Sequence, residues 1–145
     1  MKKILFIDVD EDYRMSVARA LHEANYDVQA INITSKTGLE QAKEKLLKGE
    51  FAVIIIEPET PMDDLKKGLD ALPGMRILAA WREQGIALPP IIAFTWRHYS
   101  NFFCDKCLYD RGFGCVVDKI GDTDSLLAAL ECLWETQEEA ENTPE

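Results

Sequence analysis

The chain has little positive charge and no long hydrophobic segment. Its 16 Lys and Arg residues are outnumbered by 26 Asp and Glu residues, which gives a formal net charge of −10. An acidic protein binds the phosphate backbone of nucleic acids poorly. The longest apolar run covers residues 51–56, far fewer than the roughly 20 residues that a membrane span needs, and the run at 4–7 is too short for a secretory signal. We therefore expect a cytoplasmic protein with no nucleic-acid or membrane partner.

The composition is that of one globular domain. Of the 145 residues, 47% are hydrophobic and 29% are charged, and a domain of this length buries about 70% of the surface that its unfolded chain exposes. We assign residues 1–136 to this domain and residues 137–145 to an acidic C-terminal tail, and we expect no second domain. The four cysteines are expected to be reduced thiols or metal ligands rather than disulfides.

Short apolar runs alternate along the chain with helical patterns. The expected strands, each rich in Val, Ile, Leu or Phe, are residues 3–7, 26–31, 51–56, 91–95 and 115–117. The expected helices follow capping residues or Pro and cover 11–24, the segment from Thr34 or Ser35 to Gly49, the segment from Pro73 or Met75 to Gln84, an aromatic-rich segment ending at Gly112, and the segment after Asp122 or Thr123. Five such units predict an α/β fold with a five-stranded parallel sheet and helices on both of its faces.

Four polar residues stand where the predicted strands end. They are Asp8, Glu57, Thr95 and Lys119. In open parallel sheets, ligands bind outside the carboxyl ends of the strands. We therefore expect these four side chains to lie close together and to form the functional site.

The sequences around these positions resemble the response-regulator receiver domains, the CheY-like family. The resemblance rests on IDVDED at 7–12, EPETP at 57–61, IIAFT at 91–95 and VVDK at 116–119, and it extends over about residues 2–135. It implies a doubly wound, flavodoxin-like three-layer sandwich. It also implies that Asp8 corresponds to an acidic Mg²⁺ ligand, Thr95 to the hydroxyl residue, Lys119 to the lysine, and Glu57 to the aspartate that takes a phosphoryl group from a histidine kinase.

Two positions depart from the family's pattern. Glu57 replaces the acceptor aspartate and moves the carboxylate by on the order of 1.5 Å, while a displacement of about 1 Å can cost around a hundredfold in a positioned reaction. Val9 replaces the second acid of the magnesium pair and offers no oxygen ligand, which leaves Asp8 as a weak metal ligand. These replacements predict a domain that does not use Mg²⁺-dependent phosphorylation and needs no cofactor.

We therefore favour an interaction module rather than an enzyme. It would be an atypical, stand-alone receiver domain of bacterial two-component signalling that acts, without phosphorylation, through a partner signalling protein or a homodimer. Glu57 beside Lys119 has two interpretations: a fixed imitation of a phosphorylated aspartate, or an ion pair that only satisfies buried charges. The first alternative function is a phosphorelay receiver in which a histidine kinase phosphorylates Glu57.

The segment after the fourth expected strand carries two further features. Aromatic residues, which are enriched at protein interfaces, fit either the core or a partner-binding face here; they are Trp96, Tyr99, Phe102, Phe103 and Tyr109. Cys104 and Cys107 are three residues apart and raise a second alternative function, a thiol or metal sensor. Free cysteines are commonly small buried hydrophobic residues, so we favour packing as the explanation of these two.

Overall fold

The computed structural model describes residues 1–58, 68–96 and 105–142. The strands are β1 (Lys3–Ile7), β2 (Asp27–Ile31), β3 (Val53–Ile56), β4 (Ile91–Thr95) and β5 (Cys115–Asp118). The α-helices are α1 (Glu11–Glu23), α2 (Lys36–Leu47), α3 (Pro73–Glu83), α4 (Asp105–Asp110) and α5 (Asp122–Asn142), and two 3₁₀ turns are η2 (Leu69–Ala71) and η4 (Lys119–Gly121). Strand and helix alternate along the chain as the sequence predicts.

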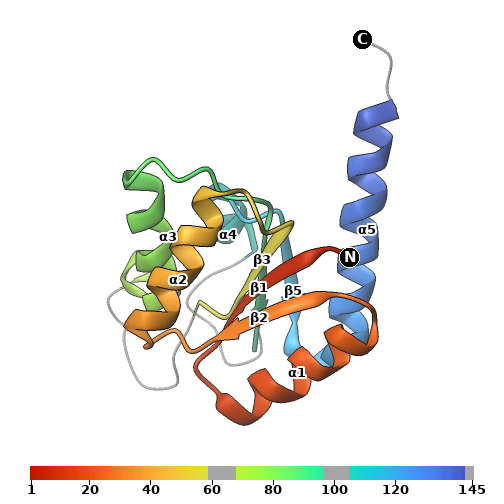
Figure 1. Ribbon diagram of the computed structural model, residues 1–145, viewed down its shortest axis with the longest axis horizontal. Helices are drawn as coiled ribbons and strands as arrows, with labels where there is room; N and C mark the ends of the chain where they lie inside the picture. The colour runs from red at the N-terminus through yellow and green to blue at the C-terminus, as the bar shows by residue number, and fades with distance from the viewer. Residues whose placement is uncertain (59–67, 97–104, 143–145) are drawn as a thin grey trace.

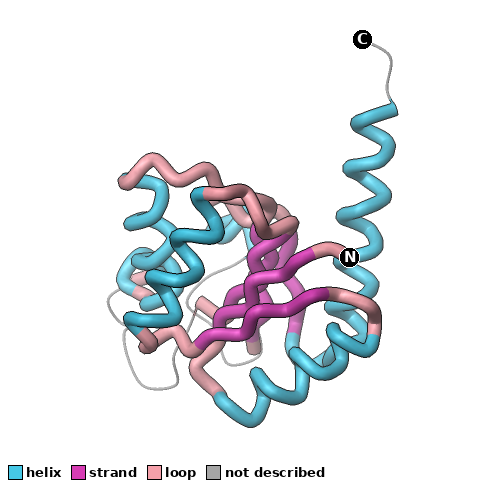
Figure 2. The backbone as a smooth tube through the Cα atoms, viewed as in Figure 1, coloured by secondary structure: helices cyan, strands magenta, loops and turns pink. Residues whose placement is uncertain are grey.

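The strands form one parallel sheet in the order β2-β1-β3-β4-β5, seen as the central layer in Figure 2. Ile7 of β1 is in register with Ile31 of β2 and with Ile56 of β3. The residues that follow β1 and β3 therefore leave the sheet at the same level. The predicted fold class, a doubly wound five-stranded α/β sandwich, is confirmed.

Helices cover both faces of the sheet (Figure 1). One core cluster contains Ala42 and Leu46 of α2, Leu78 of α3 and Leu108 of α4. The cluster on the opposite face contains buried residues of α1 and α5, namely Val17, Leu21, Leu126 and Leu130. Every residue of β1 after Lys3 is buried, as expected for a strand between two layers of helices.

Local signals set most of the element boundaries. The side chains of Asp10 and Ser35 cap α1 and α2 by accepting hydrogen bonds from Tyr13 N and Gly38 N, each at 3.0 Å. β3 begins at Val53 rather than at Phe51, although Phe51 is buried.

The segment that we separate as an acidic tail continues α5 as far as Asn142. In Figure 1, this end of α5 extends beyond the body of the domain. Within the described ranges, we find no helix with the length and hydropathy of a membrane span.

Candidate functional site

The four polar residues at the strand ends are buried together at the carboxyl edge of the sheet. Asp8 follows β1, Glu57 follows β3, Thr95 ends β4, and Lys119 follows β5. Their exposed fractions are 1%, 4%, 0% and 3%. Charged side chains buried to this degree need partners of opposite charge.

Lys119 lies between two carboxylates. Its Nζ atom is 2.8 Å from Asp8 Oδ2 and 3.0 Å from Glu57 Oε2. The predicted proximity of Glu57 and Lys119 is confirmed, and Asp8 shares the same ammonium group. These three residues, which we call the charged triad, join the ends of β1, β3 and β5. Two carboxylates therefore face one ammonium group in a site shielded from water.

Both oxygens of the Asp8 carboxylate have protein partners. Oδ1 accepts a hydrogen bond from Asp10 N at 3.0 Å, and Oδ2 accepts one from Lys119 Nζ at 2.8 Å. The Asp8 carbonyl accepts a further hydrogen bond from Arg14 Nη1 at 2.9 Å. Asp10 caps α1 and Arg14 lies in its first residues, so these hydrogen bonds connect the end of β1 to the start of α1.

The residues at this edge do not fit a magnesium site. Mg²⁺ binds protein through one or two carboxylates in near-octahedral oxygen coordination. Lys119 holds Asp8 Oδ2, and Val9, at the position of the second acid, packs against the core on the α2 and α3 side. Across the three described segments, no group of three or more His, Cys, Asp or Glu residues could hold a metal ion.

Three aromatic rings surround the Lys119 ammonium. Its Nζ atom is 4.7 Å from the ring centroid of Tyr13 and 5.8 Å from those of Phe94 and Trp96. The Tyr13 ring in turn lies 6.0 Å from Phe94 and 5.8 Å from Trp96. A desolvated cation is attracted to the faces of such rings. This aromatic enclosure, made of Tyr13, Phe94 and Trp96, covers the ammonium that the two carboxylates hold.

The sequence patterns did not reveal the enclosure. The sequence leaves Trp96 with two interpretations, core packing or a partner-binding face, and the structure places its ring against Tyr13 and Lys119. Tyr13 stands in the first turn of α1, where the Asp10 cap fixes its backbone. The only sequence signal for its role is an aromatic residue shortly after the strand-end aspartate.

Tyr13 and Thr95 place two hydroxyl groups in this interior. Burial raises the pKa of Tyr13, and the nearby carboxylates, with Asp122 first, raise it further. The Tyr13 phenol therefore stays neutral well into the alkaline range. In the described part of the chain, neither the Tyr13 hydroxyl nor Thr95 Oγ1 makes a hydrogen bond.

The other predicted site residues are placed as follows. Tyr109 lies on α4 with 48% of its surface exposed, and Cys107 of the same helix is half-buried. Tyr99, Phe102, Phe103 and Cys104 lie outside the described residues, so their predicted contacts stay predictions.

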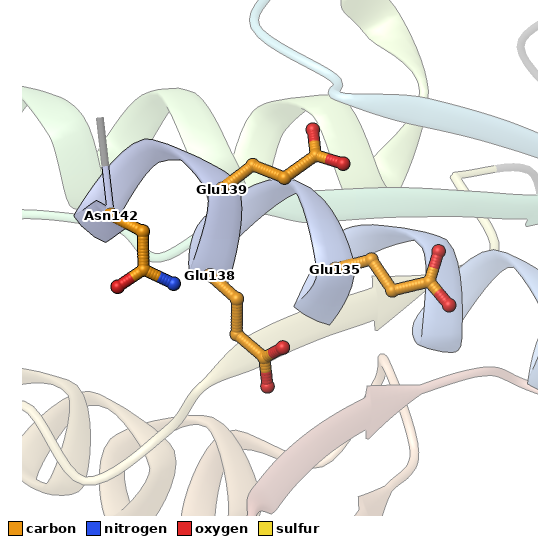
Figure 3. Close-up of a pocket in the computed structure, with 4 residues that line it drawn as sticks. All are labelled: Glu135, Glu138, Glu139 and Asn142. Carbon is orange, nitrogen blue, oxygen red and sulfur yellow. The ribbon is translucent and has the colours of Figure 1, made fainter.

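A shallow pocket on α5 is lined by Glu135, Glu138, Glu139 and Asn142. Figure 3 shows that the Glu138 and Glu139 carboxylates point to different sides of the helix. The carboxylates do not converge on one point, as a cation site would require.

No protein-family model matches the chain, and no curated protein matches it. Solved structures do match. The Vibrio cholerae chemotaxis protein CheY4 has a TM-score of 0.63 at 22% identity, over 90% of this chain and 97% of that chain. A CheY-like response regulator receiver domain protein from Methanospirillum hungatei JF-1 has a TM-score of 0.69 at 18% identity, over 97% of this chain and 98% of that chain.

A third match is the complex of the Thermotoga maritima response regulator TrrA with the histidine kinase ThkA. Its TM-score is 0.63 at 22% identity, over 92% of this chain and 98% of that chain. These matches show that the chain has the fold of the CheY-like response-regulator receiver domains.

Proposed function

We propose that the chain is a receiver-fold signalling module that acts by contact with another protein, or with a second copy, and takes no phosphoryl group on Glu57. The fold supports a signalling role, and the complex of TrrA with the histidine kinase ThkA is an example of a receiver domain that contacts a partner. The observation that carries the proposal is the position of Lys119, whose ammonium lies within 3.0 Å of two buried carboxylates.

The charged triad lacks most of the groups that phosphoryl transfer requires in a reactive position. That reaction requires an in-line nucleophile, a divalent cation on the phosphate oxygens and a fixed donor that stabilises their charge. Here Lys119, the cationic donor, is held by Asp8 and Glu57. Glu57 is longer than the usual aspartate by on the order of 1.5 Å, and Val9 offers no oxygen to a cation.

The aromatic enclosure also disfavours phosphorylation, because it restricts access to the triad. A phosphoryl donor is a large, hydrated anion. It would have to approach the ammonium group of Lys119, whose side chain is only 2% exposed. Tyr13 and Trp96 would have to move before the donor reached Lys119. The triad and the enclosure therefore hold the strand ends in one arrangement, which a partner would meet without prior modification.

The test is phosphorylation by acetyl phosphate and Mg²⁺, followed by intact-mass measurement. We expect the unmodified mass for the wild-type chain. A double variant, Val9→Asp with Glu57→Asp, supplies the two missing acids, and we expect it to gain the mass of a phosphoryl group. TrrA, solved in complex with Mg²⁺ and BeF, is the positive control. An acyl phosphate on wild-type Glu57 would refute the proposal in favour of a phosphorelay receiver.

The second arm measures association. Light scattering of the wild-type chain and of Glu57→Gln, over a range of concentrations, reports whether a second copy is the partner. If the wild-type chain forms a dimer and Glu57→Gln forms a weaker one, the triad affects the surface through which the two copies bind. Equal masses for both proteins at the monomer value would leave a different protein as the partner.

A further inference from the structure

Two thiols that the proposed function does not use lie on neighbouring elements. Cys115 is the first residue of β5, which forms one edge of the sheet. Its side chain is half-buried and packs against the core cluster on the α1 and α5 face, whereas Val116 packs on the opposite face. Cys132 lies on α5 and is exposed. Both residues thus belong to the same side of the sheet.

The path of the chain brings the two residues to the same height. A strand rises about 3.3 Å per residue and a helix 1.5 Å per residue, so about seven helical residues retrace the length of β5. In Figure 1, α5 starts near the end of β5 and runs back past it. Starting at Asp122, the helix therefore reaches the level of Cys115 at about Ala129, within one turn of Cys132.

Contacts support this placement. Ala129 and Leu133, which lie one turn before Cys132 and directly after it, pack against the same cluster as Cys115. Burial raises the pKa of the Cys115 thiol, and the neighbouring Cys132 thiol raises it further. The two thiols therefore lie on the same side of the sheet, against or beside the same core cluster, one sheltered and one open to solvent.

We propose that Cys115 and Cys132 form a redox-sensitive pair that a peroxide converts to an intramolecular disulfide between the edge strand and α5. The exposed Cys132 reacts first. Its thiolate attacks a peroxide oxygen, the O–O bond breaks, and Cys132 becomes a sulfenic acid as one water leaves.

Cys115 then resolves the sulfenic acid. Its sulfur attacks the Cys132 sulfur, the S–S bond forms, the S–O bond breaks, and a second water leaves. Two thiols are oxidised and one hydrogen peroxide is reduced to two water molecules. A small thiol reductant reverses the reaction by thiol–disulfide exchange. The disulfide ties α5 covalently to the edge of the sheet. This inference is independent of the proposed function, since it uses no residue of the charged triad.

The test is oxidation of the native chain with hydrogen peroxide, followed by intact-mass measurement and peptide mapping. We expect a loss of about 2 Da, for the two hydrogens removed, and a linked peptide pair that contains Cys115 and Cys132. The link should disappear in Cys115→Ser and in Cys132→Ser. It should persist in the matched control Cys107→Ser, which removes another half-buried thiol.

Two further measurements keep the result clear. In Cys115→Ser the sulfenic acid on Cys132 has no resolving thiol, so a dimedone adduct should accumulate there relative to the wild type. In urea, where the fold no longer brings the two thiols together, the fraction of this link should fall. The proposal is overturned if the oxidised native wild-type chain shows no link between Cys115 and Cys132, if it links Cys104 to Cys107 instead, or if only links between chains form.

Discussion

Replacing Lys119 with Met removes the single ammonium group of the charged triad and keeps an unbranched side chain of similar length. Asp8 and Glu57 then remain as two carboxylates with 1% and 4% of their surfaces exposed. The ion pairs at 2.8 and 3.0 Å are both lost. The Met side chain still packs within the aromatic enclosure, so the principal change is electrostatic.

The expected loss of stability is large. Removing one partner of a buried ion pair costs about 3–5 kcal/mol, because the other charge stays buried without compensation. A domain of this kind has a total free energy of unfolding of about 5–15 kcal/mol. At about 2–4 °C per kcal/mol for a domain of this size, the midpoint of thermal unfolding should fall by roughly 6–20 °C.

Urea unfolding at neutral pH, followed by circular dichroism, measures this loss. The matched control is Lys106→Met. Lys106 Nζ lies 3.1 Å from Asp110 Oδ2, but the two side chains are 82% and 60% exposed, so the change should be within about 0.5 kcal/mol. Glu57→Gln keeps the pair of Asp8 and Lys119 and should cost less than Lys119→Met. A Lys119→Met variant within about 1 kcal/mol of wild type, with an unchanged slope in urea, would refute our view of the triad.

Two further predictions concern residues around the triad. Because the pKa of Tyr13 is raised by burial, the unfolded chain loses the phenol proton near pH 10 while the folded chain keeps it. The contribution of Tyr13 to the free energy of unfolding is therefore fully present below about pH 10 and is lost as the pH rises above it. In urea unfolding, the stability of Tyr13→Phe should decline less steeply above about pH 10 than that of the wild type. An identical decline would contradict the role of Tyr13. In Gly74→Ala, the new Cβ would lie 2.6 Å from Pro58 Cα, so we expect a loss of about 1–3 kcal/mol in urea unfolding. A variant at least as stable as wild type would show that α3 can shift at no cost.

The apolar runs predict the fold, but they predict only some of the strand boundaries. β1 and β4 have the predicted bounds because each run is buried, apart from Lys3, and a polar or Pro residue adjoins it, such as Asp8 and Pro90. The apolar run predicts a start of β3 at Phe51, two residues before the observed start at Val53. Phe51 is 7% exposed, and burial alone does not show whether a residue pairs in the sheet. The pattern of hydrophobicity reports burial, and the register of hydrogen bonds follows from neighbouring strands.

The site was predictable only in part, for a related reason. The carboxyl ends of parallel strands lie at one edge of the sheet, so the sequence predicts that Glu57 and Lys119 are close, and the structure has them in an ion pair. It did not show that Asp8 shares the ammonium group or that Tyr13 covers it. Those contacts depend on how Tyr13, in the first turn of α1, packs against Phe94 of β4 and on side-chain rotamers, which no periodicity encodes. For the same reason, the sequence points to Cys104 and Cys107, three residues apart, and not to Cys115 and Cys132, which lie on the same side of the sheet because α5 packs there.

Burying the three charges of the triad in a mostly apolar core is energetically unfavourable unless they are paired. Buried ion pairs are often no more stabilising than apolar side chains of the same volume, so stability alone gives no reason to keep Asp8, Glu57 and Lys119 at the ends of three strands. What an ion pair does supply is a defined position, since the ammonium must stay within reach of both carboxylates. We infer that the triad fixes the relative positions of β1, β3 and β5 at their carboxyl ends. A triple replacement by apolar residues of similar size should then leave stability unchanged or raise it by about 1–4 kcal/mol. The strand ends should lose this fixed geometry, a difference that amide hydrogen exchange near positions 8 and 119 can measure.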